Sequence, residues 1–333
     1  MNIGIIYGGR STEHDASIKS KENFCNNLDN RFNIVELVFV DRLGNIQLNN
    51  KNISFGDLIN HVKDNKEIFY INLLHGQEGE DGSWSGVFDI IDGIGSFESV
   101  ITSSILMNKY YQSCVVNTHF DNLYIPKTCF INKEDSDEKI IESIKSISTE
   151  FVIVKPNSMG ASHFTEKIKK NDNANLLKLI RKIFEYDDNA LIQEFIDGDE
   201  YTCGIIELNN NPFSLPIIHV KSNFDFLDHK SKHIHGSTNC DFDDFIFKKN
   251  IEDLSCELFK LFNIIGMCRF DFLVGNDKIY FLEGNLIPGF SSESAMPMML
   301  KQANISLSDF MENLVRSYLR KQKNSKYLPY HID

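Results

Sequence analysis

Long apolar stretches are missing from this sequence of 333 residues. No run approaches the ~18 apolar residues that a membrane-spanning helix requires. The N-terminus also differs from a secretory signal peptide, because Gly8-Gly9 and the charged Arg10 interrupt its only short apolar run. The sequence therefore predicts a cytoplasmic protein with no membrane partner.

Excess positive charge and paired cysteines are missing as well. Lys and Arg total 34 against 47 Asp and Glu, a formal net charge of −13. A general nucleic-acid binder needs a basic face to neutralise phosphates, so we expect no nucleic-acid partner, although a local basic pocket for a nucleotide is not excluded. The seven cysteines are scattered without a CxxC pair, which favours free thiols over a disulfide framework or a zinc site.

The chain is longer than one compact core usually needs, so we expect two or three domains. Short apolar runs at residues 3–7 and 68–74 end at Gly8-Gly9 and His75-Gly76, and residues 17–27 between them are expected to form a helix. This alternation predicts a parallel α/β sheet whose loops Gly8-Gly9 and His75-Gly76 face one crevice. Further elements are expected as strands at 33–40, 151–154, 191–195, 201–207 and 213–220, and as a helix at 250–262.

A β-hairpin is predicted near the C-terminus, where strands 267–274 and 278–283 flank the turn Gly275-Asn276-Asp277. Residues two apart on a strand share a face. If the strands pair in register, two carboxylates, an amide oxygen and a guanidinium converge, supplied by Asp271, Glu283, Asn285 and Arg269. Such hard oxygen ligands suit Mg²⁺. The alternative is a surface ladder of salt bridges.

The segment after the hairpin offers groups that bind anions. Pro288-Gly289 forms a predicted turn, and Ser291, Ser292 and Ser294 follow it. Backbone N–H groups and hydroxyls in such a turn can hold a carboxylate or an anionic intermediate.

Six motifs, in the same order, resemble those of the D-alanine–D-alanine ligases, a family of the ATP-grasp superfamily. The C-terminal signature is matched by Arg269-Phe270-Asp271, by Leu282 to Gly289 and by Ser294. The other matches are Gly8-Gly9 through Ser17, His75-Gly76 with Gly79 to Gly82, Lys109, Lys155-Pro156 with Gly160, and Glu200 after Gly198. They extend from residue 4 to about residue 297.

This resemblance implies an α/β protein with the ATP-grasp fold and three α/β domains. The expected domains are an N-terminal substrate domain (1–108), a central ATP-grasp domain (109–196) and a C-terminal ATP-grasp domain with the Mg²⁺ and second-substrate sites (197–333). ATP would lie between the central and C-terminal domains, and a homodimer is usual in the family.

The implied activity is an ATP- and Mg²⁺-dependent ligase, with Mn²⁺ as an alternative metal. It would form the acyl-phosphate of a D-amino acid, by default D-alanine, and join it to a second one to give D-alanyl-D-alanine for peptidoglycan. Alternatives are a D-alanine–D-lactate, D-serine or other specialised ligase, and an ATP-binding regulatory homologue without turnover.

The resemblance also implies residue roles. ATP would be bound by Lys109, Lys155, Gly160, Ser162, Gln193, Glu194, Phe195, Ile196, Glu200 and Lys232, and the metal by Asp271, Glu283 and Asn285. Substrate and transition-state contacts would come from Glu13, Arg269, Gly289, Ser294 and His233. By the same resemblance, His75 would line the first-substrate side, with a structural histidine as the alternative. Without the resemblance, Glu13 would be interpreted as a carboxylate at a helix N-terminus. Lys109 and Lys155, both expected on strands, would be interpreted as solvated charges.

Several positions depart from the family pattern. Ala161 lacks the usual serine hydroxyl and Phe164 stands in place of a glycine, so the phosphate loop is expected to close differently. His233 replaces a tyrosine, and a histidine there could disfavour an ammonium nucleophile; alternatively, His229, His233 and His235 simply belong to a polar exposed loop. Ala295 and Ser96-Phe97-Glu98 also differ, which leaves the substrates open.

Overall fold

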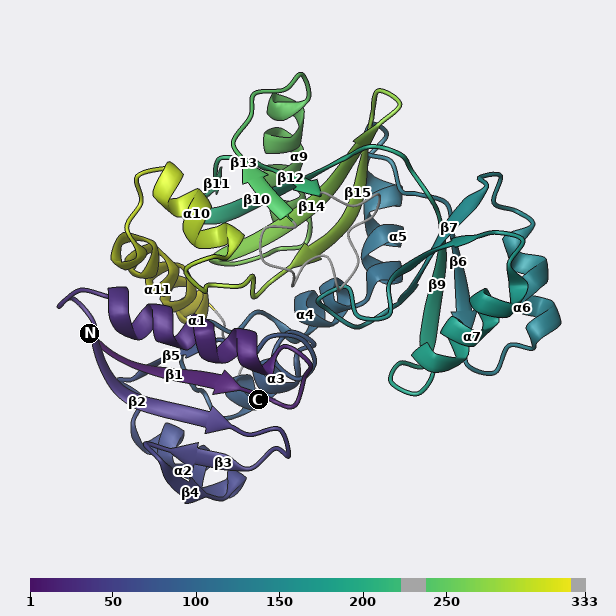
Figure 1. The fold of residues 1–333 in the computed structure, drawn as a ribbon. Helices are drawn as coiled ribbons and strands as arrows, with labels where there is room; N and C mark the ends of the chain where they lie inside the picture. The colour runs from purple at the N-terminus through teal and green to yellow at the C-terminus, as the bar shows by residue number, and fades with distance from the viewer. Residues whose placement is uncertain (223–237, 325–333) are drawn as a thin grey trace, which may run out of the picture.

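Three β-sheets organise the part of the chain that is described, residues 1–222 and 238–324 of this computed structural model (Figure 1). Each sheet lies within one of the three predicted domain ranges. In Figure 1, the N-terminal sheet lies at the lower left, the largest sheet above it, and the third at the right. None of the described helices is both long and apolar enough to cross a bilayer.

The N-terminal sheet has the strand order β4-β3-β2-β1-β5. Its members are β1 (Asn2–Gly8), β2 (Asn33–Val40), β3 (Ile46–Leu48), β4 (Lys51–Ile53) and β5 (Phe69–Asn72). Pairing of β1 with β2 and β5 is parallel, as predicted, whereas β3 and β4 extend the sheet as an antiparallel hairpin. The helices of this part are α1 (His14–Asn27), α2 (Phe55–Asp64) and α3 (Ser83–Ile90).

The third sheet is antiparallel, with the order β6-β9-β7-β8. Its strands are β6 (Thr128–Asn132), β7 (Phe151–Pro156), β8 (Glu166–Lys169) and β9 (Asn189–Glu194). Helices α6 (Asp137–Ile144) and α7 (Asn173–Ile183) bury Ile140, Leu176 and Ile180 against it. Burial of such aliphatic side chains stabilises this unit by roughly 1.5–3 kcal/mol each.

The largest sheet has the order β13-β12-β10-β14-β15, with β11 paired to β10. The strands are β10 (Asp199–Leu208), β11 (Asn211–Ser214), β12 (Ile218–Ser222), β13 (Thr238–Asp241), β14 (Met267–Gly275) and β15 (Lys278–Asn285). The predicted single strand at 213–220 is wrong, because the chain leaves the ladder between Ser214 and Ile218. Pro216 lies in this break and has no N–H to donate to a ladder.

The remaining described helices lie between β5 and β6, between β13 and β14, or after β15 in the sequence. They are α4 (Val100–Met107), α5 (Lys109–His119), α9 (Lys248–Leu261), α10 (Ala295–Gln302) and α11 (Leu307–Asn324). Helix α11 lies beside α1 and the N-terminal sheet (Figure 1). Phe290, which follows β15, lies at the junction of the N-terminal part with α11. Its ring centroid is 5.2 Å from that of Phe24 on α1 and 5.3 Å from that of Phe310 on α11.

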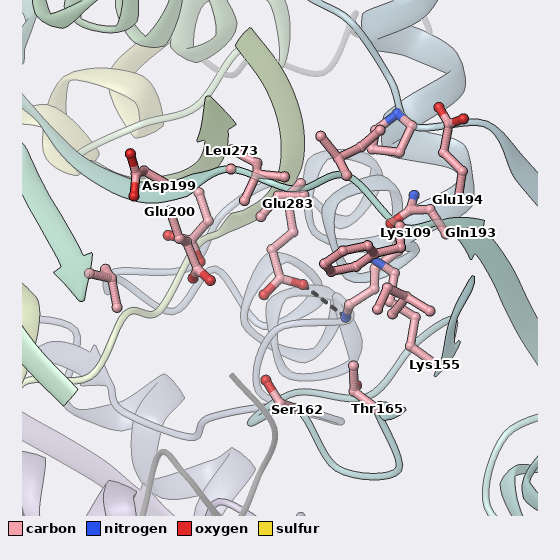
Figure 2. A pocket seen from close by; sticks show the side chains of 18 of the residues that line it. Lys109, Lys155, Ser162, Thr165, Gln193, Glu194, Asp199, Glu200, Leu273 and Glu283 are labelled. Carbon is pink, nitrogen blue, oxygen red and sulfur yellow. Dashed lines mark ion pairs between the residues drawn. The ribbon is translucent and has the colours of Figure 1, made fainter. Parts of the chain in front are cut away.

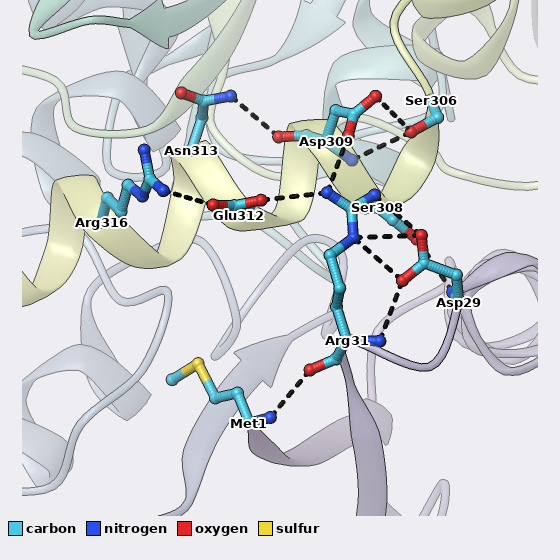
Figure 3. A network of polar contacts seen from close by, with 9 residues as sticks. All are labelled: Met1, Asp29, Arg31, Ser306, Ser308, Asp309, Glu312, Asn313 and Arg316. Carbon is cyan, nitrogen blue, oxygen red and sulfur yellow. Dashed lines mark hydrogen bonds and ion pairs between the residues drawn. The ribbon is translucent and has the colours of Figure 1, made fainter.

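At the surface of this junction, a polar network links Asp29 and Arg31 to α11 (Figure 3). The Arg31 guanidinium pairs with Asp309 at 2.8 Å and with Glu312 at 3.0 Å, both on α11. Asp29 also pairs with Arg31, and its backbone N–H donates to Ser308 Oγ at 2.9 Å. Exposed pairs of this kind contribute little singly, so the buried aromatic contacts carry most of the junction's stability.

Glu98 is a buried carboxyl at this junction. Its Oε1 accepts hydrogen bonds from the Ile265 N–H at 2.6 Å and from the Tyr318 hydroxyl at 3.0 Å. No described residue forms a hydrogen bond with its Oε2. Burial raises the pKa of Glu98 to about 7 from its ordinary 4.5, because a low-dielectric interior disfavours the charged form.

The Glu98→Gln variant tests this burial. Because the folded-state pKa is the higher one, the stability that Glu98 contributes is lost as the pH rises from 4.5 to about 7. The free energy of unfolding of the variant minus that of the wild type should therefore increase by up to about 3 kcal/mol between pH 5 and pH 8. Urea unfolding at both pH values measures it, and an unchanged difference would contradict the buried, protonated carboxyl.

Candidate active site

Two adjoining cavities contain every predicted site residue that the structure describes. A cavity of about 580 Å³ is lined by Lys109, Lys155, Gly160, Ser162, Gln193, Glu194, Phe195, Ile196, Glu200, Asp271 and Glu283. A second, of about 340 Å³, is lined by Glu13, Arg269, Asn285, Gly289 and Ser294. Lys109, Gly160, Ser162 and Glu283 line both, so the cavities meet there. Lys232 and His233 lie outside the described residues.

The larger cavity lies between the third sheet and the largest sheet. Lys155 comes from β7, Glu200 from β10 and Glu283 from β15, and their side chains surround one space in Figure 2. Residues 193–196 form the crossing from β9 to β10 along its wall. Its size and its mixture of apolar and charged lining suit a small-molecule ligand.

The β14–β15 hairpin contains a register shift between Asp271 and Phe272 that the sequence did not predict. Because Phe272 pairs with Phe281, an unbroken register would have placed Asp271 opposite Leu282. Asp271 lies opposite Glu283, and Arg269 lies opposite Asn285. The Arg269 guanidinium binds both oxygens of Asp271, with Nε–Oδ1 at 2.9 Å and Nη2–Oδ2 at 2.7 Å. Thr202 on the neighbouring strand β10 donates to Asp271 Oδ1 at 2.5 Å. Because Asp271 is only 6% exposed, this group is not a surface ladder of salt bridges.

The oxygen atoms of this hairpin fit a divalent cation. Asn285 Oδ1 is buried, and no described residue is its hydrogen-bond partner. Leaving a buried amide oxygen unpartnered costs about 1–3 kcal/mol, and the neighbouring Asp271 and Glu283 supply two carboxylates. Mg²⁺ and Mn²⁺ both accept carboxylate and carbonyl oxygens.

Lys109 connects the two cavities. It is the first residue of helix α5, whose preceding residue Asn108 caps the helix by accepting from the Tyr111 N–H. The interpretation of Lys109 as a strand residue is therefore wrong, whereas Lys155 lies on β7 as predicted. The Lys109 ammonium lies 3.1 Å from Glu283 Oε2 (Figure 2) and donates to the Met159 carbonyl at 2.7 Å.

The wall formed by residues 193–196 is held mainly by neighbouring segments. The Gln193 side-chain amide donates to Thr128 Oγ1 at 2.8 Å, and Glu194 Oε1 accepts from the Lys127 N–H at 2.8 Å. The Lys167 ammonium lies 3.7 Å from the centroid of the Phe195 ring. These contacts fix the side chains. The N–H groups of Glu194 and Phe195 donate to the carbonyls of Lys127 at 2.8 Å and of Phe151 at 3.3 Å, which holds the backbone along the cavity wall.

The small-residue loop at 157–165 adopts an unusual backbone. Ala161, Ser162 and Phe164 have φ values of 51°, 53° and 54°, a region that glycine adopts most easily. A Cβ at Gly160 would lie 2.3 Å from Glu13 Oε2, so a larger residue there would displace the Glu13 carboxylate. Two of the positions that depart from the family pattern, Ala161 and Phe164, therefore adopt a left-handed backbone without being glycine. That the loop closes differently stays a prediction.

Phe164 gains contacts that compensate for its backbone. Its ring stacks on Tyr186, with centroids 5.3 Å apart and an interplanar angle of 19°. The Lys182 ammonium lies 5.0 Å from the centroid of the Phe164 ring. Phe164 therefore anchors the end of the loop to the third sheet's helical layer, beyond α7.

The smaller cavity combines acidic and neutral groups. Glu13 immediately precedes α1 and makes no side-chain hydrogen bond that caps this helix. Its carboxylate is directed towards Gly76 and Gly160, each of which would place a Cβ within 3.0 Å of Oε2. On the opposite wall, Ser294 Oγ lies 2.7 Å from Ser291 Oγ.

His75 is both part of the cavity wall and a structural residue. It is 3% exposed, with Nδ1 at 2.7 Å from the Ile287 carbonyl and Nε2 at 3.0 Å from Ser20 Oγ. Burial lowers the pKa of His75 to about 4, so the imidazole is neutral at neutral pH. The two interpretations of His75 are therefore compatible.

Glu80 was not singled out by sequence reasoning, although it lies inside the Gly79–Gly82 motif. It is buried in the smaller cavity, and its oxygens accept from the Gly76 and Ile287 N–H groups. Burial, followed by the charge of Glu13, raises the pKa of Glu80 to about 8. His219 and Lys221 also line the larger cavity, and no pattern in the sequence indicated them.

A double-mutant cycle between Phe164 and Tyr186 tests the loop anchor. Each change to alanine should lower stability, and the two effects should be coupled by about 0.5–1 kcal/mol because they remove the same stacked pair. Denaturant unfolding of the two single variants and the double variant measures this coupling. Effects that add to within the experimental error would contradict the stacking.

Comparison with known proteins gives concordant results. The family model described as "D-ala D-ala ligase C-terminus" matches residues 122–316. A D-alanine–D-alanine ligase from Clostridium botulinum is 27% identical over 95% of this chain and 97% of its own, and one from Azobacteroides pseudotrichonymphae is 29% identical over 95% and 99%. The crystal structure of a D-alanine–D-alanine ligase from Bacillus anthracis complexed with ATP is 25% identical, with a TM-score of 0.77 over 97% of this chain and 99% of its own. The ligase structure from Coxiella burnetii has a TM-score of 0.79 at 22% identity, covering 97% and 95%.

Proposed function

Because the chain belongs to the D-alanine–D-alanine ligase family, we propose that it joins two D-alanine molecules, using ATP and Mg²⁺, to make D-alanyl-D-alanine for peptidoglycan in the cytoplasm. The fold expected for this family, ATP-grasp in the α/β class, is the fold of this chain. The observation that carries the proposal is the meeting of the two cavities at Lys109 and Glu283, beside the oxygen-rich hairpin.

The larger cavity is the proposed ATP site. Residues 193–196 would present backbone groups to the adenine, and Glu200 would accept from the ribose hydroxyls. Lys109 and Lys155 would neutralise phosphate charge under the loop that contains Gly160 and Ser162. Lys232 is proposed as a further phosphate contact. With these roles, the proposed domains are 1–108, 109–196 and 197–333.

The proposed metal ligands are Asp271, Glu283 and Asn285. Mg²⁺ bound there would offset the negative charge of the phosphate oxygens. Arg269 fixes the Asp271 carboxylate through two hydrogen bonds, and Lys109 lies against Glu283. These contacts orient the carboxylates before a ligand enters, which reduces the reorganisation that binding requires.

The smaller cavity is the proposed site for both amino acids. Glu13 would hold the ammonium group of the first D-alanine, and Ser294 the carboxylate of the second. A carboxylate oxygen of the first D-alanine takes the γ-phosphoryl group of ATP and ADP leaves. The amine of the second then attacks the acyl carbon, and phosphate and a proton are released.

Attack of the amine places negative charge on the acyl oxygen. Arg269 and the Gly289 N–H both border the smaller cavity and would stabilise this charge. Among the described residues, none accepts a hydrogen bond from the Gly289 N–H. His75 is neutral there and adds no competing positive charge.

Phosphate release with ATP, Mg²⁺ and D-alanine tests the proposal, with products identified by mass. We expect one phosphate for each D-alanyl-D-alanine formed. Turnover only when D-lactate or D-serine is added would mean that this compound, and not D-alanine, is the second substrate. It would also favour a role of His233 in specificity. No phosphate release with any of these mixtures would contradict ligase activity and favour a regulatory ATP-binding homologue.

Variants of the hairpin test the metal ligands. Asp271→Ala and Glu283→Ala should each lower turnover by at least about 100-fold, because either change removes a carboxylate that aligns the phosphates. Asp253→Ala is the matched control, since Asp253 is exposed on α9 and, among the residues that the structure describes, pairs with Lys249. Wild-type turnover in either hairpin variant would remove that residue from the metal site.

A further inference from the structure

The main chain of residues 287–290 is held by side chains from the N-terminal part of the protein. At Ile287, the N–H donates to Glu80 Oε2 at 3.2 Å, and the carbonyl oxygen lies 2.7 Å from His75 Nδ1. Both backbone polar groups of Ile287 are therefore bound by the loop that follows β5. The partners are 207 and 212 residues away in the sequence.

The same arrangement recurs at Phe290. Its N–H donates to Ser20 Oγ at 3.1 Å, and its carbonyl accepts from the Asn23 side-chain amide at 2.8 Å. Ser20 and Asn23 are both on α1. The Phe290 ring is fully buried and packs on Phe24 of the same helix. Four hydrogen bonds thus hold a segment of four residues at both of its ends.

The hydrogen bonds form a chain with one consistent direction. The Ile287 carbonyl can only accept, so His75 carries its proton on Nδ1. His75 Nε2 is then an acceptor for the Ser20 hydroxyl, whose oxygen accepts in turn from the Phe290 N–H. A protonated imidazole would present a second donor to Ser20 and disturb this order.

Gly289 lies between the two held residues and follows Pro288, whose ring fixes its own φ. The Gly289 N–H therefore has little freedom to move while Ile287 and Phe290 stay in place. Donors to a developing oxyanion must be positioned to within about 0.5 Å, and a displacement of about 1 Å can cost about 100-fold in rate.

We infer that Ser20, Asn23, His75 and Glu80 are positioning residues, which place the Gly289 N–H for the acyl-transfer step. This inference rests on the proposed function. Helix α1 begins directly after Glu13, so one helix places both the proposed ammonium-binding carboxylate and the oxyanion donor. The geometry of amine attack is set from the N-terminal part, although the metal ligands lie on the hairpin.

Ser20→Ala and Asn23→Ala test the inference at the two atoms of Phe290. Each should lower kcat for dipeptide formation about 10-fold and leave the KM for ATP unchanged, because the larger cavity is intact. The acyl-phosphate would still form but would be captured less well by the amine, so water would consume more of it. The ratio of phosphate released to dipeptide formed should rise at least about twofold.

Asn26→Ala is the matched control. Asn26 is an exposed asparagine of the same helix, α1. This variant should keep the wild-type ratio of phosphate to dipeptide. Thermal unfolding of all three variants separates a loss of stability from a loss of positioning. Asn23→Ala is less prone to misfold than Ser20→Ala, because Asn23 is half-buried and Ser20 is fully buried.

The outcomes are distinct. A raised ratio in Ser20→Ala and Asn23→Ala, but not in Asn26→Ala, supports the positioning role. A lower melting temperature with the wild-type ratio would reduce these residues to a structural role and overturn the inference. If the wild-type protein makes no dipeptide or depsipeptide at all, the proposed function fails and the inference fails with it.

Discussion

The pairing register of β14 and β15 is the constraint on which the site depends. It sets Asp271 against Glu283 and Arg269 against Asn285, so a shift by one residue would turn these side chains to the other face of the sheet. Arg269 and Thr202 then hold Asp271, and Asn285 is left with a buried oxygen that no described residue satisfies. A sheet buried for stability alone would gain more from apolar side chains at these positions.

The other parts of the fold bring groups to this hairpin. Lys109 reaches Glu283 from α5 and simultaneously binds the loop carbonyl of Met159. From the opposite side, α1 and the loop after β5 hold the segment that leaves β15. The cavity proposed for the nucleotide and the cavity proposed for the amino acids therefore meet at Lys109 and Glu283, which suits a reaction that moves a phosphoryl group between two ligands. Non-glycine residues in left-handed conformation at Ala161 and Phe164 show that the loop between them keeps its shape at some conformational cost.

Much of this could be predicted from the sequence. The hairpin and its turn follow from the sequence, whereas the register shift that sets Asp271 opposite Glu283 does not. The parallel pairing of β1 and β5 was also predictable. Of the two loops expected to face one crevice, His75-Gly76 lines the smaller cavity and Gly8-Gly9 does not. The resemblance to a family named the residues that line both cavities. Local patterns failed where distant parts decide the outcome. Lys109 starts a helix because Asn108 caps it, and Pro216 divides a run that looks like one strand. Burial lowers the pKa of His75 and raises that of Glu80. Both side chains also bind Ile287, more than 200 positions away, and no local pattern contains such contacts.

The most direct test of the account is a crystal structure grown with Mn²⁺ and a non-hydrolysable ATP analogue, with anomalous diffraction used to locate the metal. We predict an anomalous peak about 2.0–2.3 Å from oxygens of Asp271, Glu283 and Asn285, with the nucleotide in the larger cavity. A nucleotide bound there without metal at the hairpin, or metal and nucleotide bound elsewhere, would contradict the assignment of the β14–β15 hairpin as the centre of the site.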